Sequence, residues 1–324
     1  MFPNGLEVLA IPAFIGGILL LYKGSDILVD GTVKTATQLG VSALIISVLL
    51  VGFGTSAPEF AISAGAAIQQ NSDISLGNVI GSCIANLLLV LGIAALIKPI
   101  KVERGIIKRE VPILLGATII LFVWSFFGLL DQYHIIGGIS FLLMFAAFVL
   151  FFVHCAHKER DVKNKKVNPG KTGKNIFFII LGIAGVVIGA ELLIVSSVEI
   201  AELLGIPAFL IALSMVAVGT SLPELVVSAM ASYKGESDIA VGNVLGSNVF
   251  NILLILGFAA MFIPLNAIGK LDHTIILLLV TITMVPICCT KRGISRFEGF
   301  LMLVAYGVFM WYIFGGNQFI ASFF

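Results

Sequence analysis

Apolar runs of about 20 residues recur from one end of this chain to the other, and they limit the possible folds more than any other feature. A helix of about 20 residues spans a hydrocarbon core of ~30 Å. Charged residues make up only 11% of the chain and hydrophobic residues 59%, too little charge to cover the surface of a soluble protein. The runs also lack the alternation of a transmembrane β-barrel. The sequence therefore predicts an all-α polytopic membrane protein.

We expect ten transmembrane helices joined by short loops. The first apolar run begins close to Met1 and lacks the basic flank of a signal peptide, so we interpret it as the first span. The expected spans are residues 6–28, 41–68, 74–97, 110–130, 134–156, 174–198, 206–232, 238–264, 272–290 and 296–316.

Basic residues gather on alternate loops, and this bias orients the chain. The richest loop lies between the two halves and reads "HKERDVKNKKVNPGKTGK" from His157. Loops rich in Lys and Arg remain on the cytoplasmic side of a membrane. We therefore expect both termini to be extracellular and the 157–173 loop to be cytoplasmic. The small size and the lack of targeting segments favour a multi-pass protein of a prokaryotic cell (plasma) membrane.

The two halves of the chain repeat each other at a constant offset, which is the separation of Glu59 from Glu224 and which we call the repeat offset. Positions 39–92 align with 204–257 without a gap, and about 26 of the 54 positions are identical. Shared hydrophobicity alone does not match Gly, Pro, Asn and Glu one for one. Because each half has five spans, the second half enters the membrane from the opposite side, which predicts an inverted repeat with a binding site near the midplane.

The repeat also predicts how the chain is divided. The expected units are a first five-helix repeat at 1–156, a cytoplasmic linker loop at 157–173 and a second five-helix repeat at 174–324.

Each repeat carries a Pro-Glu pair inside a predicted span. "GTSAPEF" begins at Gly54 and "GTSLPEL" begins at Gly219. Proline gives no N–H to the carbonyl four residues earlier, so we expect Pro58 and Pro223 to free the carbonyls of these two glycines. Unpaired carbonyls in a membrane must face a cavity, a partner or an ion.

The span after each Pro-Glu pair carries a polar stripe. "SLGNVIGSCIANLLL" places Asn78, Ser82 and Asn86 at intervals of four, and "AVGNVLGSNVFNILL" repeats the pattern in the second half. Cys83 is the departure, because Asn248 stands at the corresponding position. Asn78 and its counterpart Asn243 fit interhelical hydrogen bonding as well as ion binding, so they are not among the candidate ligands.

Together the motifs predict an all-oxygen site, which suits hard cations such as Ca²⁺, Na⁺ and Mg²⁺. Two ionised glutamates near the midplane cost several kcal/mol unless they are compensated. One Ca²⁺ neutralises both, and so do two Na⁺. A site that crosses the membrane only when neutralised predicts obligatory exchange.

The motif pairs "GTSAPE…GNVIGSCIAN" and "GTSLPE…GNVLGSNVFN" resemble the α-1 and α-2 repeats of the sodium/calcium exchangers, in particular the compact archaeal and prokaryotic members of the cation/calcium exchanger superfamily. The resemblance covers nearly the whole chain. It implies an antiporter that exchanges Na⁺ for Ca²⁺ by alternating access, electrogenically and with Ca²⁺ export. It also implies that spans 1 and 6 are long, tilted helices that slide across the other eight.

The same resemblance implies the ligands. Glu59 and Glu224 correspond to the central Ca²⁺ ligands, which are shared with Na⁺, while Thr55 and Thr220 contribute mainly backbone carbonyls. The remaining candidate ligands, in the flanking Na⁺ sites and the middle of the site, are Ser56, Ser221, Ser82, Ser247, Asn86, Asn251 and the carbonyls of Gly52 and Ala217.

Two departures from the family pattern refine this expectation. In close archaeal relatives Asp stands at the position of Asn251, and in the potassium-dependent branch Asp there is associated with K⁺ transport. Asn at both middle positions therefore favours a K⁺-independent exchanger. The 157–173 linker is too short for the Ca²⁺-sensing domains of animal exchangers, so we expect no such regulation.

Three other functions stay open at this point. The first is an H⁺-coupled Ca²⁺/cation exchanger on the same fold, with the glutamates as proton carriers. The second is a passive cation channel. The third is an intramembrane hydrolase, but neither motif offers the histidine that a nucleophile or metal site would need, so we expect no enzyme. We expect no cofactor, no nucleic-acid partner and no obligatory protein partner, only the bilayer and the transported ions.

Overall fold

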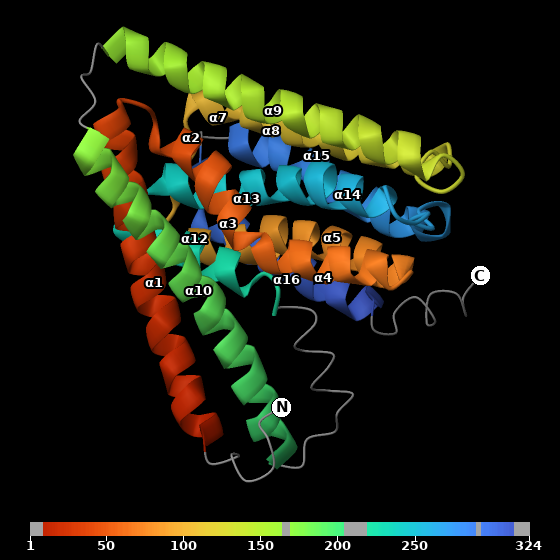
Figure 1. Ribbon diagram of the computed structural model, residues 1–324, viewed down its shortest axis with the longest axis horizontal. Helices are drawn as coiled ribbons and strands as arrows, with labels where there is room; N and C mark the ends of the chain where they lie inside the picture. The colour runs from red at the N-terminus through yellow and green to blue at the C-terminus, as the bar shows by residue number, and fades with distance from the viewer. Residues whose placement is uncertain (1–8, 164–168, 204–218, 290–292, 314–324) are drawn as a thin grey trace.

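The computed structural model describes residues 9–163, 169–203, 219–289 and 293–313. These residues are almost entirely helical (Figure 1). Among them, six helices are long and apolar enough to cross a membrane, or seven if one bent pair counts as a span. The prediction of a helical, multi-pass membrane protein is confirmed. The count of ten spans and the inverted arrangement stay predictions.

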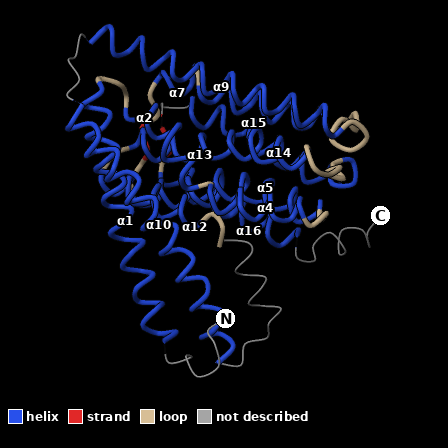
Figure 2. Tube along the Cα trace, viewed as in Figure 1, coloured by secondary structure: helices blue, strands red, loops and turns tan. Residues whose placement is uncertain are grey.

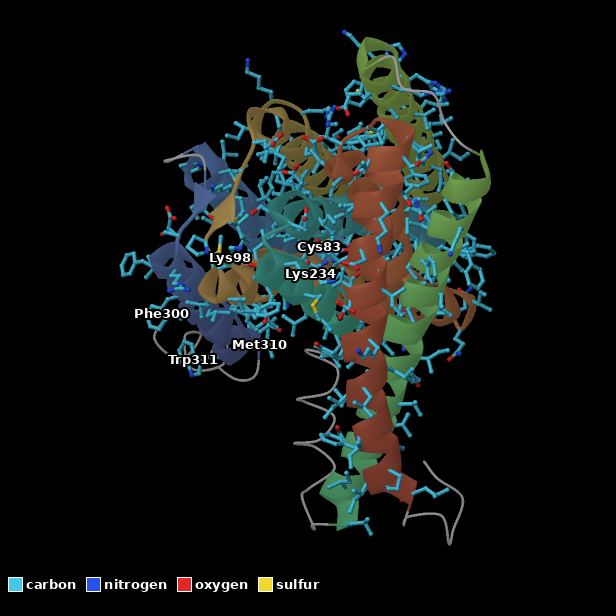
Figure 3. The ribbon with its side chains drawn as sticks, turned by 90° about the vertical axis from the view of Figure 1, so that its left-hand side faces the viewer. Cys83, Lys98, Lys234, Phe300, Met310 and Trp311 are labelled. Atoms are coloured by element: carbon cyan, nitrogen blue, oxygen red, sulfur yellow. The ribbon has the colours of Figure 1, made fainter. Side chains whose placement is uncertain are left out.

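Two long helices stand apart from the others, α1 (Ala10–Leu39) and α10 (Pro169–Leu203). They lie side by side and cross the remaining helices at a steep angle (Figure 1), and Figure 3 shows that they extend beyond the rest of the bundle. The first span was expected to end near residue 28, but α1 continues as far as Gly40, its C-cap. This glycine has a φ of 75° and its N–H donates to the Ala36 carbonyl, a left-handed helix end that favours glycine.

Glycines allow the two long helices to approach backbone to backbone. A Cβ atom added at Gly24 would lie 2.8 Å from the nitrogen of Val186, and one added at Gly17 would lie 2.9 Å from the nitrogen of Leu193. Gly189, on α10, has equally close neighbours on α1. We call this contact the glycine seam. Small residues at helix interfaces in membranes allow this close packing.

The span expected at 41–68 is a broken helix. Its two parts, 43–55 and 57–68, are bent by 47° where Ser56 joins them. Pro58 lies in the first turn of the second part, where its missing N–H breaks no helical hydrogen bond. The segments in order are α2 (Ala43–Ile46), the π-helical turn η2 (Ser47–Val51), α3 (Gly52–Thr55) and α4 (Ala57–Ile68).

The counterpart of α4 in the second half is α12 (Leu222–Lys234), where Pro223 again lies in the first turn of a helix. The two helices with polar stripes lie in the centre of the bundle, and each contains a π-helical turn at its asparagine. The first consists of α5 (Ser72–Ala85), η3 (Asn86–Val90) and α6 (Leu91–Ile97). The second consists of α13 (Ser237–Val249), η4 (Phe250–Ile255) and α14 (Leu256–Ala260).

Further helices surround this centre. Their bounds are α7 (Arg104–Lys108), α8 (Glu110–Phe126), α9 (His134–Lys163), the 3₁₀ helix η5 (Ile268–Lys270), α15 (Leu271–Cys289) and α16 (Arg296–Trp311). Because α9 continues to Lys163 and α10 begins at Pro169, the described parts of the 157–173 segment are helical. The expectation of a loop there is wrong for these residues, and their Lys, Glu and Arg are good helix formers.

At each end of the bundle, connecting segments that are far apart in the sequence contact each other. Strands β1 (Ile100–Lys101) and β2 (Gly293–Ile294) form a short antiparallel ladder, drawn in red near α2 and α7 in Figure 2. At the other end, the Asp131 carboxylate accepts the N–H groups of Ala267 at 2.7 Å and Ile268 at 2.9 Å.

One ion-pair cluster joins the long pair to the centre. Lys234, labelled in Figure 3, ends α12, and its Nζ lies 2.6 Å from a carboxylate oxygen of Asp26 and 2.6 Å from one of Asp30, both on α1.

Candidate cation site

Two glutamates lie at the centre of the candidate site, each in the first turn of its helix. Glu59 is the third residue of α4 and Glu224 the third of α12, and both side chains are 0% exposed. The N-terminus of a helix favours a negative charge. In the part of the chain that the structure describes, no ion pair includes either glutamate. The two carboxylates are therefore not explained by a structural ion pair with Lys or Arg.

Glu224 is held by hydroxyl groups from both halves of the chain. Its Oε1 accepts hydrogen bonds from Ser56 Oγ at 3.1 Å and Ser247 Oγ at 3.2 Å. Ser247 Oγ also lies 3.2 Å from the carbonyl oxygen of Gly52. Four of the predicted ligands thus meet in one hydrogen-bonded group.

Thr55 and Gly52 extend this group. The Thr55 hydroxyl lies 3.0 Å from Oδ1 of Asn243 and 3.4 Å from the Ser247 hydroxyl. A Cβ atom added at Gly52 would lie 3.0 Å from the backbone nitrogen of Ser247. Glycine at this position therefore allows α13 to pack against the bend, which brings Ser247 to the Gly52 carbonyl.

The second Thr-Ser pair repeats one of these contacts, between its threonine and the serine of the other half. The Thr220 hydroxyl lies 3.3 Å from the Ser82 hydroxyl, and Ser221 is buried immediately before α12. The Gly219 carbonyl accepts the N–H of Leu222 at 3.2 Å, so the expectation that Pro223 leaves it free is wrong. The chain turns at Gly219 instead of continuing as a helix, which gives the carbonyl a nearer donor. Ala217 lies outside the described residues.

Several buried polar atoms around this group have no hydrogen-bond partner. An unpaired buried polar atom costs about 1–3 kcal/mol, and an unpaired charge costs more. The unpartnered atoms at the predicted site are both carboxylate oxygens of Glu59, Oε2 of Glu224, Oδ1 of Asn86, and Oδ1 and Nδ2 of Asn251. Carboxylate and amide oxygens without donors are the ligands that a hard cation takes.

The donor set also limits how a cation is held. Among residues 9–163, 169–203, 219–289 and 293–313, no three His, Cys, Asp or Glu side chains are grouped as a metal centre requires. A cation here therefore depends on amide, hydroxyl and carbonyl oxygens beside the two carboxylates. Such mixed, largely neutral oxygen sets suit Na⁺ and Ca²⁺.

Asn78 and Asn243 act mainly between helices. Asn78 Nδ2 donates to Ser63 Oγ at 2.9 Å, and Asn243 Nδ2 donates to Ser228 Oγ at 3.0 Å. The interhelical interpretation of both asparagines is confirmed. The sequence motifs did not point to Ser63 and Ser228, although the repeat offset relates these two serines and was the signal that could have identified them.

The two carboxylates have different surroundings despite their matching motifs. Glu224 Oε1 accepts two hydroxyl groups, whereas neither oxygen of Glu59 has a partner. The positions equivalent to Ser56 and Ser247 are Ser221 and Ser82. The Ser82 hydroxyl lies near Thr220 just as the Ser247 hydroxyl lies near Thr55, but neither oxygen of Glu59 accepts a hydroxyl group. The two halves therefore have different local conformations around equivalent residues.

Comparison with known proteins adds independent findings. A family model described as "Sodium/calcium exchanger protein" matches residues 9–154 and 174–315. The matched residues contain every glutamate, threonine, serine and asparagine of the candidate site.

Two relatives resemble the chain over most of its length. The sodium/calcium exchanger MaX1 of Methanosarcina acetivorans is 36% identical, over 91% of this chain and 95% of that protein. The putative antiporter CaxA of Alkalimonas amylolytica is 35% identical, over 90% of this chain and 94% of that protein.

Solved structures resemble the fold equally well. The sodium-calcium exchanger NCX_Mj soaked with Na⁺ and Ca²⁺ matches with a TM-score of 0.80 and 33% identity, over 93% of this chain and 97% of that one. The same exchanger soaked with Na⁺ and Sr²⁺ gives a TM-score of 0.82.

Proposed function

This chain belongs to the sodium/calcium exchanger family, and from that membership we propose that it exchanges Na⁺ for Ca²⁺ across the cell membrane by alternating access. Its relatives are ion transporters, and it is a transporter rather than an enzyme. The observation that carries the proposal is the set of buried oxygens without partners at Glu59, Glu224, Asn86 and Asn251. A bound cation would compensate these acceptors in a membrane interior.

Charge balance at the site supports coupling. When both are ionised, Glu59 and Glu224 together carry two negative charges, which one Ca²⁺ or two Na⁺ neutralise. A third Na⁺ held by neutral oxygens would make each exchange move one net charge, so the transport is electrogenic. Asn86 and Asn251 add no charge, and this supports K⁺ independence.

The proposed ligands follow from these surroundings. Glu59, Glu224, Asn86 and Asn251 form the central site, because they carry the unpartnered oxygens. Thr55 and Thr220 contribute mainly backbone carbonyls to the central site. The flanking Na⁺ sites use hydroxyl and carbonyl groups of Ser56, Ser221, Ser82, Ser247, Gly52 and Ala217.

We also propose ten spans in two inverted repeats, with both termini extracellular. Matching details in the two halves support this. Asn78 Nδ2 lies 3.3 Å from the Glu59 carbonyl, and Asn243 Nδ2 lies 3.3 Å from the Glu224 carbonyl. The pair α1 and α10, each much longer than a bilayer requires, is then the body that slides against the centre.

The different surroundings of the two glutamates support alternating access. In the conformation of this structure, Glu224 accepts hydrogen bonds from Ser56 and Ser247, while Glu59 has no hydroxyl partner. When the halves exchange conformations, Ser221 and Ser82 would close around Glu59 in the same way.

The test is ⁴⁵Ca²⁺ uptake into proteoliposomes preloaded with Na⁺, beside vesicles loaded with K⁺, choline or acid. We expect uptake only with internal Na⁺, and loss of this uptake in Glu59→Gln. Because each exchange would carry one net positive charge out of the vesicle, a K⁺ diffusion potential that makes the interior positive should accelerate uptake. Uptake driven by an acid interior would replace Na⁺ coupling with H⁺ coupling. Uptake that needs no gradient would identify a channel.

A further inference from the structure

We propose that Asn248 is a positioning residue of the cation site. Asn248 holds the side-chain amide of Asn86 so that the oxygen of Asn86, and not the nitrogen, faces the ion. The proposal rests on the proposed function for the identity of the ion. The orientation itself rests on a chain of two hydrogen bonds that ends at a backbone carbonyl.

The chain of hydrogen bonds ends at Cys83. Its backbone carbonyl can only accept a hydrogen bond, and Asn248 Nδ2 lies 3.1 Å from it. Asn248 is 0% exposed, so no water competes for its amide. The nitrogen of the Asn248 amide must therefore face Cys83, and its oxygen must face the other way.

The second link fixes Asn86. Oδ1 of Asn248 lies 3.0 Å from Nδ2 of Asn86. Because this oxygen is only an acceptor, Asn86 must turn its NH₂ group toward it. Oδ1 of Asn86 then points away from Asn248, and it is one of the buried oxygens without a partner. A cation attracts this oxygen, whereas an amide nitrogen at the same place would repel it.

Asn251 has only the Cys83 thiol beside it in the equivalent place. By the repeat offset, Asn251 corresponds to Asn86, and the residue that corresponds to Asn248 is Cys83. A thiol is a weak donor and a weak acceptor, so it does not distinguish the two ends of an amide. Both amide atoms of Asn251 are unpartnered. One middle ligand is thus fixed in advance, and the other turns to suit the ion.

A fixed oxygen should matter most for affinity. Without Asn248 the Asn86 amide would occupy both orientations, and Ca²⁺ would have to select one on binding. We expect Asn248→Cys to raise the half-saturating Ca²⁺ concentration about five- to tenfold, with less than a twofold change in maximal rate. Cysteine is chosen because the chain already places it at the corresponding position.

The control variant is Cys83→Ala, which removes the thiol but keeps the backbone carbonyl. We expect its half-saturating Ca²⁺ concentration to stay within twofold of the unmodified protein. A loss as large as that of Asn248→Cys would contradict the proposal, because the orientation would then depend on the thiol.

The decisive measurement is a double-mutant cycle with Asn86→Asp. An aspartate presents an oxygen whichever way it turns, so its orientation no longer needs Asn248. We expect Asn248→Cys to cost no further affinity in the Asn86→Asp background. An equal loss in both backgrounds would mean that Asn248 only supports packing, and the proposal would be wrong.

Equilibrium ⁴⁵Ca²⁺ binding to purified protein separates this proposal from the proposed function. If binding weakens in Asn248→Cys as expected, the orientation argument holds even where vesicles show no Na⁺-driven uptake. If vesicles exchange Na⁺ for Ca²⁺ while Asn248→Cys binds Ca²⁺ normally, the proposed function holds and the role of Asn248 is refuted.

Discussion

The outer helices α1 and α10 and the central helices that begin at Ser72 and Ser237 are both long and apolar, but they are joined by opposite means. The best apolar window of each outer helix is 28% buried, against 72% and 94% for the two central ones. The outer pair meets through the glycine seam. The central pair meets through serine and asparagine side chains, some of which keep unpartnered oxygens. Buried polarity is thus concentrated where a cation would compensate it.

The contact between the two regions follows the same division. Beside the bend at Ser56, Gly54 leaves room for the side chain of Ile183 on α10, an apolar contact without hydrogen bonds. The ion pairs of Lys234 lie at one end of the interface. An apolar contact imposes little directional preference, so it suits a surface along which two bodies are displaced.

The largest expected effect is that of Glu224→Gln in the central region. We expect about a 100-fold loss of Na⁺-dependent ⁴⁵Ca²⁺ uptake, with no fall in the thermal midpoint measured without ions. The reason is that the variant removes an uncompensated buried charge. Glu103→Gln, at an exposed residue, is the matched control. A lower thermal midpoint in Glu224→Gln would contradict this expectation, because the central carboxylates would then contribute to stability.

The second effect tests the outer region with two adjacent glycines. Gly17 lies in the seam, whereas a Cβ atom at Gly16 would meet nothing within 4 Å. We expect Gly17→Ala to destabilise the protein by about 1–3 kcal/mol through overpacking, and Gly16→Ala to have no measurable effect. Thermal unfolding in detergent measures both. Equal effects would show that the seam does not hold the two helices together.

A smaller effect is expected at Ser247, whose hydroxyl donates to Glu224. Loss of one such hydrogen bond costs about 1 kcal/mol, so we expect Ser247→Ala to weaken Ca²⁺ binding about fivefold. Ser82→Ala is the matched variant, because the Ser82 hydroxyl lies near Thr220 as Ser247 lies near Thr55, but Glu59 accepts no hydrogen bond from it. Equilibrium binding that weakens equally in both would mean that the surroundings of Glu59 and Glu224 do not differ at rest.

The smallest effect is expected at Lys234. Its ion pairs with Asp26 and Asp30 are partly exposed, so Lys234→Ala should change stability by less than about 1 kcal/mol. Burial lowers the pKa of Lys234, but hydrogen bonds to both aspartates outweigh this and raise it above the usual 10.5. The contribution is thus present below that pH and is lost as pH rises through the raised pKa. Thermal midpoints of the variant should differ from the unmodified protein equally at pH 6 and pH 9.

Much of this architecture follows from local sequence. Apolar runs locate the helices, and the repeated Pro-Glu and Asn-Ser-Asn patterns identify Glu59, Glu224, Asn86 and Ser247 as a group. Each of these inferences depends on residue type and spacing alone, which act locally. The repeat offset adds long-range information, because it shows which positions are equivalent.

Other features depend on contacts between distant residues. The first span was expected to end near residue 28, but Lys234, far away in the chain, pairs with Asp26 and Asp30, and α1 continues past them. The difference between Cys83 and Asn248 looked like an irregularity of the repeat. The hydrogen bond from Asn86 to Asn248 could not be predicted, because it joins residues from different halves of the chain. The turn at Gly219 likewise gave its carbonyl a partner that proline alone did not predict.

The β1–β2 ladder constrains the threading of the chain through the bilayer by parity. Lys101 pairs with Gly293, so both lie on one side, and the chain between them must cross an even number of times. The bond from Ala267 to Asp131 imposes the same rule on a shorter stretch at the opposite face. The expected spans place six crossings in the first interval and four in the second. A natural or engineered variant that gains or loses a single span inside either interval would have to give up the corresponding pairing.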